Sequence, residues 1–228
     1  MKPRLLIWGE GGVAGHVLSI VASGATAYPQ IGFLLDDAPA GQHEVLGYPL
    51  LGTRQVLKEL DPALNHVFPA GSSPAVRREM AQYLHTLGFF SPTLIDPDAR
   101  VRPTAQLGQG CLIEAFAFVD HRALLGDFVL LGNYASVAHD CQVGDYSSLY
   151  IGSRVLGHAV LAEGCLLGAN ACLFPSRRMG RWSKASVLSA VDQDVPDFHL
   201  VSGNPAQIVR AYGGPPPVSL YPLPDMLD

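Results

Sequence analysis

The chain from residue 95 to residue 196 repeats one hydrophobic pattern every six residues. Counted in sixes from Ile95 to Val191, 16 of the 17 positions hold Ile, Leu, Val or Met, and Ala185 is the exception. The fifth residue of each group is Ala, Cys or Ser in 14 of the 17 groups. Glycine often takes the second position, as at Gly108 and Gly126.

A period of six fits neither the 3.6-residue turn of an α-helix nor the two-residue alternation of a simple strand. It indicates a chain that turns a corner every six residues, with the aliphatic residue pointing inward and the small residue packed where backbones meet. Three groups close a coil of 18 residues, and such coils stack their short strands into parallel β-sheets. The pattern therefore predicts an uninterrupted β-helix.

The first 90 residues follow a different pattern, in which short apolar runs alternate with helical spacing. Strands are predicted at 5–8, 31–35 and 66–68, and helices at 13–21, 53–60 and 74–87. This alternation with short links predicts a small parallel sheet covered by helices, which is a Rossmann-like α/β domain. The predicted organisation is an α/β domain at residues 1–90, a β-helix at residues 91–200 and a tail at residues 201–228.

Charge and composition narrow the function classes. The formal charge is −5 with no basic stripe, so nucleic acid is not an expected partner. No apolar run reaches the roughly 18 residues of a membrane span, and the apolar start of the chain is too short for a signal peptide, so we expect a cytoplasmic protein that does not bind a membrane. The cysteines at Cys111, Cys141 and Cys165 take the small fifth position, which predicts packed thiols rather than disulfides.

A histidine and a carboxylate adjoin within the coils, at His139 and Asp140. They take the third and fourth positions of their group, so neither is the inward residue. An imidazole suits a general base near neutral pH, and a carboxylate can orient it and stabilise its charged form. A solvated surface histidine is the alternative interpretation. A coil of 18 residues places His121 one rung below His139 and Gly157 one rung above, which predicts open space beside the imidazole.

Metal binding is not expected at this pair of histidines. The β-helical carbonic anhydrases bind their metal with three histidines from two subunits, two of them close in sequence. Here His158 falls at a different corner position, and neither a His-x4-His nor a Cys-x-x-Cys motif occurs.

A glycine-rich loop follows the first predicted strand, at residues 9–12. Glycines let backbone amides approach a phosphate at a helix N-terminus. Asp36 and Asp37 end the second predicted strand, where carboxylates can accept hydrogen bonds from a ribose or a base. A plain strand–helix turn is the alternative interpretation. Bound NAD is disfavoured, because nothing after residue 90 resembles a hydride-transfer domain.

Taken together, four segments and the hexads resemble one known family. The segments are Gly9-Glu10-Gly11-Gly12, Phe33-Leu34-Leu35-Asp36-Asp37, Ser136-Val137-Ala138-His139-Asp140-Cys141 and Gly203-Asn204-Pro205-Ala206. They are similar to those of the hexapeptide-repeat family of sialic acid O-acetyltransferases and nucleotide-amino-sugar N-acetyltransferases of bacterial glycan pathways. The resemblance covers residues 4 to about 210 and implies that the β-helix is left-handed.

The resemblance also implies an activity and a site. The expected enzyme transfers an acetyl group from acetyl-CoA to an amino group of a nucleotide-linked sugar, with His139 as general base and Asp140 as its orienting group. The expected assembly is a homotrimer with sites between neighbouring prisms. Positions matching Gly11, Gly12, Val13, Asp36, Asp37 and Gly71 hold the nucleotide, and positions matching Ser148, Gly157 and Ala169 meet coenzyme A.

Three positions depart from the family pattern. The family often has His where Val13 stands, Asn where Gly132 stands, and a second His where Ser148 stands. Two alternative functions stay open, of which only the non-catalytic one is supported by departures, those at Gly132 and Ser148. One is O-acetylation of a sialic-acid-like sugar within the same fold, and the other is a non-catalytic protein that binds a nucleotide-sugar.

Overall fold

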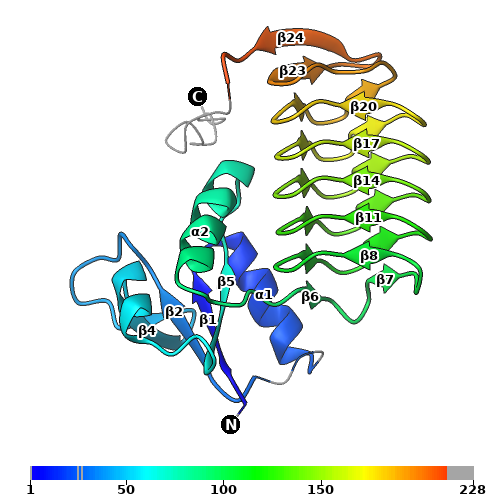
Figure 1. Ribbon diagram of the computed structural model, residues 1–228. Helices are drawn as coiled ribbons and strands as arrows, with labels where there is room; N and C mark the ends of the chain where they lie inside the picture. The colour runs from blue at the N-terminus through cyan, green and yellow to red at the C-terminus, as the bar shows by residue number, and fades with distance from the viewer. Residues whose placement is uncertain (1, 25, 27, 215–228) are drawn as a thin grey trace.

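The chain folds into two parts that lie side by side, a small α/β domain and a long triangular prism (Figure 1). The computed structural model describes residues 2–24, 26 and 28–214. The second half of the predicted tail, residues 215–228, lies outside this range. No helix in the described ranges is both long enough and apolar enough to span a membrane.

The α/β domain is built on one sheet with the strand order β3-β4-β2-β1-β5. Neighbouring strands run parallel except for the β3–β4 pair. The strands are β1 (Arg4–Trp8), β2 (Ile31–Leu34), β3 (Glu44–Val45), β4 (Tyr48–Gly52) and β5 (Asn65–Pro69). The helices are α1 (Gly12–Ala22), the 3₁₀ helix η1 (Arg54–Glu59) and α2 (Pro74–Thr86).

The parallel sheet confirms the predicted α/β class. Two local details differ from the prediction. The segment at 53–60 forms a 3₁₀ helix, and the short hairpin of β3 and β4 has no counterpart in the predicted elements. The Ser73 side chain caps α2 by accepting a hydrogen bond from the Val76 amide, and Pro74 occupies its first turn.

The prism is the predicted β-helix, a left-handed stack of two-residue strands. Each strand pairs in parallel with the strand one coil away, as Val119 pairs with Val137 and Val137 with Val155. The strands are β6 (Leu94–Ile95), β7 (Arg100–Val101), β8 (Gln106–Leu107), β9 (Leu112–Ile113), β10 (Phe118–Val119), β11 (Leu124–Leu125), β12 (Leu130–Leu131), β13 (Ser136–Val137), β14 (Gln142–Val143), β15 (Ser148–Leu149), β16 (Arg154–Val155), β17 (Val160–Leu161), β18 (Leu166–Leu167), β19 (Cys172–Leu173), β20 (Arg178–Met179), β21 (Lys184–Ala185) and β22 (Ala190–Val191).

Three sheets form the faces of the prism. We name them the first face (β6-β9-β12-β15-β18-β21, continued by β23 and β24), the second face (β7-β10-β13-β16-β19-β22) and the third face (β8-β11-β14-β17-β20). The aliphatic residue of each group and its small fifth residue point into the prism, and the apolar ones from Cys111 to Val191 belong to one buried cluster. The positions of the six-residue pattern are therefore the positions that form the hydrophobic core of the prism.

The corners explain two further features of the repeat. From Gly110 to Leu188 the fourth residue of each group turns the corner with a left-handed backbone, also where it is not glycine, as at Phe116, Tyr134 and Asp140. The second position favours glycine because the rungs approach closely there. A Cβ on Gly168 would lie 2.6 Å from the backbone nitrogen of Val187 in the coil above.

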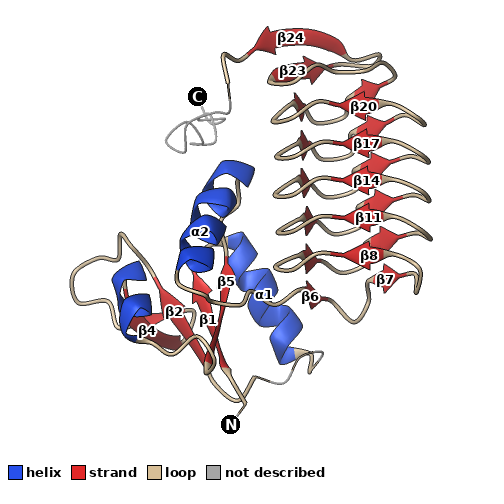
Figure 2. Cartoon of the chain, viewed as in Figure 1, coloured by secondary structure: helices blue, strands red, loops and turns tan. Residues whose placement is uncertain are grey.

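The period breaks in the last coil. Met179 bridges Val195, and Ala185 pairs with Val201, so the spacing falls from 18 to 16 residues. Counting in sixes from Ile95 places Val195 at the small fifth position, which is wrong, because the shortened coil places this residue beside Met179. The hairpin of β23 (His199–Ser202) and β24 (Gln207–Ala211) then closes the stack, as Figure 2 shows.

The α/β domain packs on the first face, near its lower end. Leu94, Leu112 and Leu130 of that face join a buried cluster with side chains of β1 and α1. Higher up, α2 runs along the corner between the third and first faces, where Arg78 stacks on the ring of Trp182 with its guanidinium carbon 4.4 Å from the ring centroid. The two parts therefore share a core and a second line of contact.

Candidate functional site

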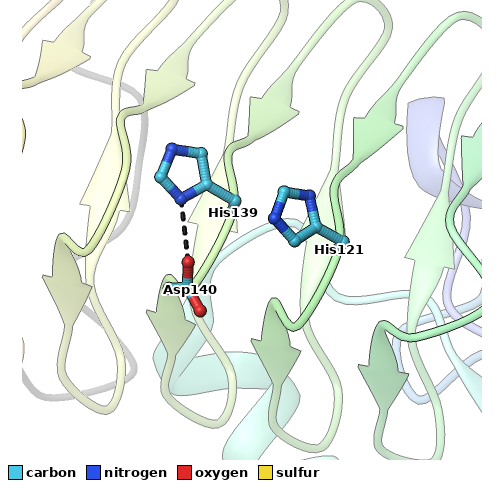
Figure 3. A group of neighbouring side chains, drawn as sticks. All are labelled: His121, His139 and Asp140. Carbon is cyan, nitrogen blue, oxygen red and sulfur yellow. Dashed lines mark hydrogen bonds and ion pairs between the residues drawn. The ribbon is translucent and has the colours of Figure 1, made fainter.

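His139 stands on the corner between the second and third faces, in the turn that joins β13 to β14. Its Nδ1 lies 2.9 Å from Oδ2 of Asp140 (Figure 3). A carboxylate only accepts hydrogen bonds, so this contact assigns the hydrogen to Nδ1 and leaves Nε2 with a free lone pair. The imidazole is half-exposed. The structure thus brings the two predicted catalytic residues together in the arrangement that a general base requires.

Asp140 is held from both sides. Arg122, one rung below, donates from Nε to Oδ1 over 2.6 Å and from Nη2 to Oδ2 over 2.9 Å. The hydrogen bonds from Arg122 and then from His139 lower the pKa of this carboxyl well below its usual range. Asp140 is therefore ionised at any pH at which His139 is a base. Sequence reasoning missed Arg122, although its 18-residue spacing from Asp140 identifies it as a rung neighbour.

Gly157 has a different surrounding from the one predicted. The space below it is not open, because the His139 ring fills it, and a Cβ on this glycine would lie 2.8 Å from Cε1 and Nε2 of His139. His121 stacks on the other side of the ring with a centroid distance of 5.4 Å and an angle of 14°. The imidazole is thus enclosed between a glycine above and a second imidazole below.

His121, His139 and Asp140 also place one ligand atom each within 4.8 Å of one another. Both oxygens of Asp140 already accept hydrogen bonds, Oδ1 from Arg122 and Oδ2 from Arg122 and His139. The donor set as built serves hydrogen bonding.

A cavity of about 330 Å³ opens at the carboxyl ends of β1, β2 and β5. Three predicted nucleotide-binding residues, Asp36, Asp37 and Gly71, line it together with Trp8, Glu10 and Arg54. This is the edge at which open α/β sheets bind ligands. The expected site and the observed cavity coincide here.

The glycine loop lies beside this cavity at the start of α1. Gly11 is the N-cap residue with a left-handed φ of 86°, and no atom lies within 4 Å of the place that a Cβ would take on Gly11 or Gly12. The backbone of the loop is therefore open to a phosphate at the helix N-terminus. Val13 is partly buried and packs against the core shared with the prism, which gives its side chain a structural contact.

Asp36 is already engaged inside the cavity. It accepts hydrogen bonds from Nε of Arg54 over 2.7 Å and from Nε1 of Trp8 over 3.1 Å, and Arg54 stacks over the Trp8 ring. Burial alone would raise the pKa of Asp36, but the hydrogen bonds from Arg54 outweigh it and the pKa is lowered. Asp36 therefore orients Arg54, and Arg54 is a cavity residue that the sequence patterns did not indicate.

The prediction that Ser148 meets coenzyme A is not supported. Its side chain is fully buried on the first face and accepts a hydrogen bond from Nη2 of Arg77 over 2.8 Å. Ser148 precedes the inward Leu149 and so lies on the outside of its strand, where Arg77 of α2 covers it. Ala169 and Gly157 lie on the two corners that flank the second face, and Ala169 is partly exposed.

The two halves of the predicted site lie on opposite sides of the prism. The α/β domain with its cavity packs on the first face, whereas His139 stands on the corner between the other two faces. One chain alone therefore does not bring the imidazole to its own cavity.

Comparisons with known proteins match both parts of the chain. The family model described as the PglD N-terminal domain matches residues 4–84. No match was found among curated protein sequences.

Among solved structures, the acetyltransferase domain of PglB from Neisseria gonorrhoeae in complex with acetyl coenzyme A is 32% identical, with a TM-score of 0.85 over 92% of this chain and 100% of that one. PerB from Caulobacter crescentus in complex with CoA and GDP-perosamine is 26% identical, with a TM-score of 0.81 over 90% of this chain and 96% of that one. WeeI from Acinetobacter baumannii, 22% identical, shares the fold, with a TM-score of 0.82 over 91% of this chain and 100% of that one.

Proposed function

Because this chain belongs to the hexapeptide-repeat sugar acetyltransferases, we propose that it transfers the acetyl group of acetyl-CoA to an amino group of a nucleotide-linked sugar. The observation that carries this proposal is the half-exposed His139, whose Nδ1 is hydrogen-bonded to Asp140 and whose Nε2 has no hydrogen-bond partner among residues 2–24, 26 and 28–214. The co-substrate follows from the similar structures that hold acetyl coenzyme A or CoA. The amino-sugar acceptor is supported by PerB, which holds GDP-perosamine.

The proposed reaction is a direct transfer. The sugar amine, bound in its neutral form, attacks the thioester carbonyl carbon while Nε2 of His139 takes a proton from the nitrogen. The carbon–sulfur bond then breaks, and the sulfur leaves as the thiol of CoA after receiving the proton from the imidazolium. Asp140 stays charged throughout and stabilises the imidazolium through Nδ1–H. The products are an amide and free CoA.

The proposed active unit is a homotrimer. A site that uses both His139 and the cavity at Asp36 needs two chains, because the prism separates them within one chain. In this arrangement the glycine loop at Gly11 and Gly12, with Asp37 and Gly71, holds the nucleotide. Backbone groups near Gly157 and Ala169 hold coenzyme A along the second face.

The test is release of free thiol from acetyl-CoA in the presence of UDP-, GDP- and dTDP-linked amino sugars. We expect one nucleotide class to support turnover and His139→Ala to reduce kcat by about 10²–10⁴-fold, the range for a general base. The matched control is His43→Ala, which removes an exposed imidazole of the α/β domain that does not line the cavity and should retain activity within about threefold of the unmodified chain. Equal turnover of the unmodified chain and His139→Ala would remove His139 from the mechanism.

Product analysis separates the other functions. An amide product survives mild base, whereas an ester product is hydrolysed and would indicate O-acetylation. Binding of a nucleotide-sugar without binding of acetyl-CoA, measured by calorimetry, would replace the enzyme with a non-catalytic binding protein.

A further inference from the structure

We propose that Arg122 is a positioning residue for the reaction: it holds Asp140 in the orientation that aims one oxygen at His139, and by sharing that carboxylate it sets the pH range in which His139 acts. This inference rests on the proposed role of His139 as general base. It concerns a residue outside the His–Asp pair, and its role follows from the contacts between successive rungs.

The geometry of the contact is that of a fork. Arg122 and Asp140 occupy the same corner position on successive rungs, with φ values of 56° and 59°. Two nitrogens of the guanidinium meet the two carboxylate oxygens at 2.6 Å and 2.9 Å. A planar fork of this kind fixes the plane of the carboxylate, which the point charge of a lysine cannot do.

The orientation matters because Asp140 has a choice of partners. Its Oδ2 accepts from Nδ1 of His139 at 2.9 Å, and Nε2 of His158, one rung above, lies 4.0 Å from the same oxygen. A carboxylate released from Arg122 is free to turn toward His158. His139 would then lose the contact that fixes its tautomer and ring orientation.

The second effect is electrostatic. The rings of His121 and His158 lie against His139, and Asp140 contacts it directly and is bound by Arg122. Further down the same corner, Asp120 contacts His121 and Arg102. Arg122 offsets the charge of Asp140 directly. Asp140 adjoins His139 in the chain, so its charge stays near the imidazole even when the hydrogen bond is lost. Without Arg122 this charge is no longer offset and stabilises the imidazolium form of His139, so the neutral, reactive form appears only at higher pH.

The experiment compares pH–rate profiles of the full-length protein and three variants with acetyl-CoA and the nucleotide-sugar identified in the thiol assay. In Arg122→Ala we expect kcat at neutral pH to fall about tenfold and the acidic limb of the profile to move up by about 0.5–1 pH unit. In Arg122→Lys the charge remains, so the limb should return toward its original pH while kcat stays low. The KM values for both substrates should change less than about twofold.

Arg181→Ala is the matched control. Arg181 and Asp197 form a similar exposed pair, with Nε donating to Oδ2 over 2.9 Å, on another part of the prism. Its removal should leave the pH–rate profile unchanged. Because 64% of the Arg122 side chain and 60% of the Arg181 side chain are exposed, both variants should fold, which a thermal melt checks.

Titration of the His139 imidazole by NMR in the absence of substrates separates this inference from the proposed function. An upward shift of its midpoint in Arg122→Ala, together with the shifted rate profile, supports the role of Arg122. If the NMR midpoint of His139 rises in Arg122→Ala while the pH–rate profile does not move, Arg122 does influence His139 through Asp140, but His139 is not the general base. Superimposable midpoints in Arg122→Ala and the unmodified chain overturn the role proposed for Arg122.

Discussion

The prism and the α/β domain place their functional side chains in different ways. In the prism, each side chain has predictable neighbours one coil below and one coil above, so the surroundings of Asp140 follow from counting. In the α/β domain, Asp36 meets Trp8 and Arg54, which come from different elements and follow no period. The first kind of site can be derived from a repeat, whereas the second requires the fold.

Arg77 links the two regions. It is fully buried on α2 and donates to backbone oxygens of Gly71 in the cavity loop and of Phe128 and Tyr146 on the prism corner. Buried carbonyls that lose their donor cost stability, so this side chain couples the cavity to the coils. Replacing Arg77 should therefore uncouple the unfolding of the α/β domain from that of the prism.

The largest effect is expected for Arg77→Met. The change leaves several buried carbonyls without their donor, and we expect the free energy of unfolding to fall by about 2–4 kcal/mol. The chain offers a probe for each region, because its two tryptophans are Trp8 in the sheet and Trp182 on the prism. Trp8→Phe and Trp182→Phe versions report each region separately by fluorescence.

In the unmodified chain both probes should show the same denaturant midpoint, whereas in Arg77→Met the α/β domain should unfold first. A common midpoint in Arg77→Met would mean that the shared apolar core alone couples the two parts.

Two glycines of the prism should respond differently to alanine. In Gly157→Ala the new methyl meets the His139 ring, which can swing outward, so we expect kcat to fall about 10–100-fold with little change in stability. In Gly168→Ala the methyl meets the backbone of the next coil, and we expect a loss of about 1–3 kcal/mol. Steady-state kinetics and chemical denaturation measure the two effects. Equal destabilisation of both variants would contradict a site-specific role for Gly157.

Substitutions of the two cavity carboxylates, Asp36 and Asp37, should also have different effects. Asp36→Asn weakens the hold on Arg54, so we expect KM for the nucleotide-sugar to rise about 5–10-fold and the melting temperature to fall slightly. Asp37 is exposed, so Asp37→Asn should change KM without changing the melting temperature.

Because the pKa of Asp36 is lowered in the folded chain, its stabilising contribution is present above the unfolded value near pH 4. It is lost as the pH falls through the folded value. In Asp36→Asn this part of the acid dependence should disappear from thermal melts.

The smallest effect concerns the thiols, all of which lie in the prism. Burial raises the pKa of Cys111 and of Cys165 to about 11, and Cys141 is also buried, whereas Cys172 is half-buried on the second face. We expect a thiol reagent to label about one cysteine per native chain and Cys172→Ser to abolish that labelling. Rapid labelling of further thiols in the native chain would contradict the tight stacking of the coils.

The sequence was sufficient for the prism because one hydrophobic period specifies its core, its corners and its rungs. The period gave the wrong position for Val195, because the last coil is two residues shorter and no local sequence pattern indicates the change. The hairpin of β3 and β4 was missed for a similar reason. Its turn places Leu46 and Gly47 at positive φ, and leucine is not a residue that marks such a turn.

For the site, the sequence identified the residues that chemistry requires but not all of their contacts. His139 and Asp140 are adjacent, so their pairing needed only a local turn. The period indicates that Ser148 points outward, but it does not show which element covers that face. In the structure α2 covers it, and Arg77 of this helix donates a hydrogen bond to Ser148. Arg54 could not be recognised, because its place beside Asp36 depends on how β2 and η1 come together.

The prism should unfold from one end, the end of the stack that carries the capping hairpin. Every residue of β24 is exposed, while the opposite end is clamped by the α/β domain through Leu112 and Leu130. In a linear stack each coil is supported by its neighbours, so fraying under heat or force starts at the unclamped end and proceeds downward. His139 lies in the coil of β12, β13 and β14, which also carries Leu130, so this coil is itself held by the α/β domain and is among the last to open. The contacts of His139 with Asp140 should therefore outlast the melting of the uppermost coils.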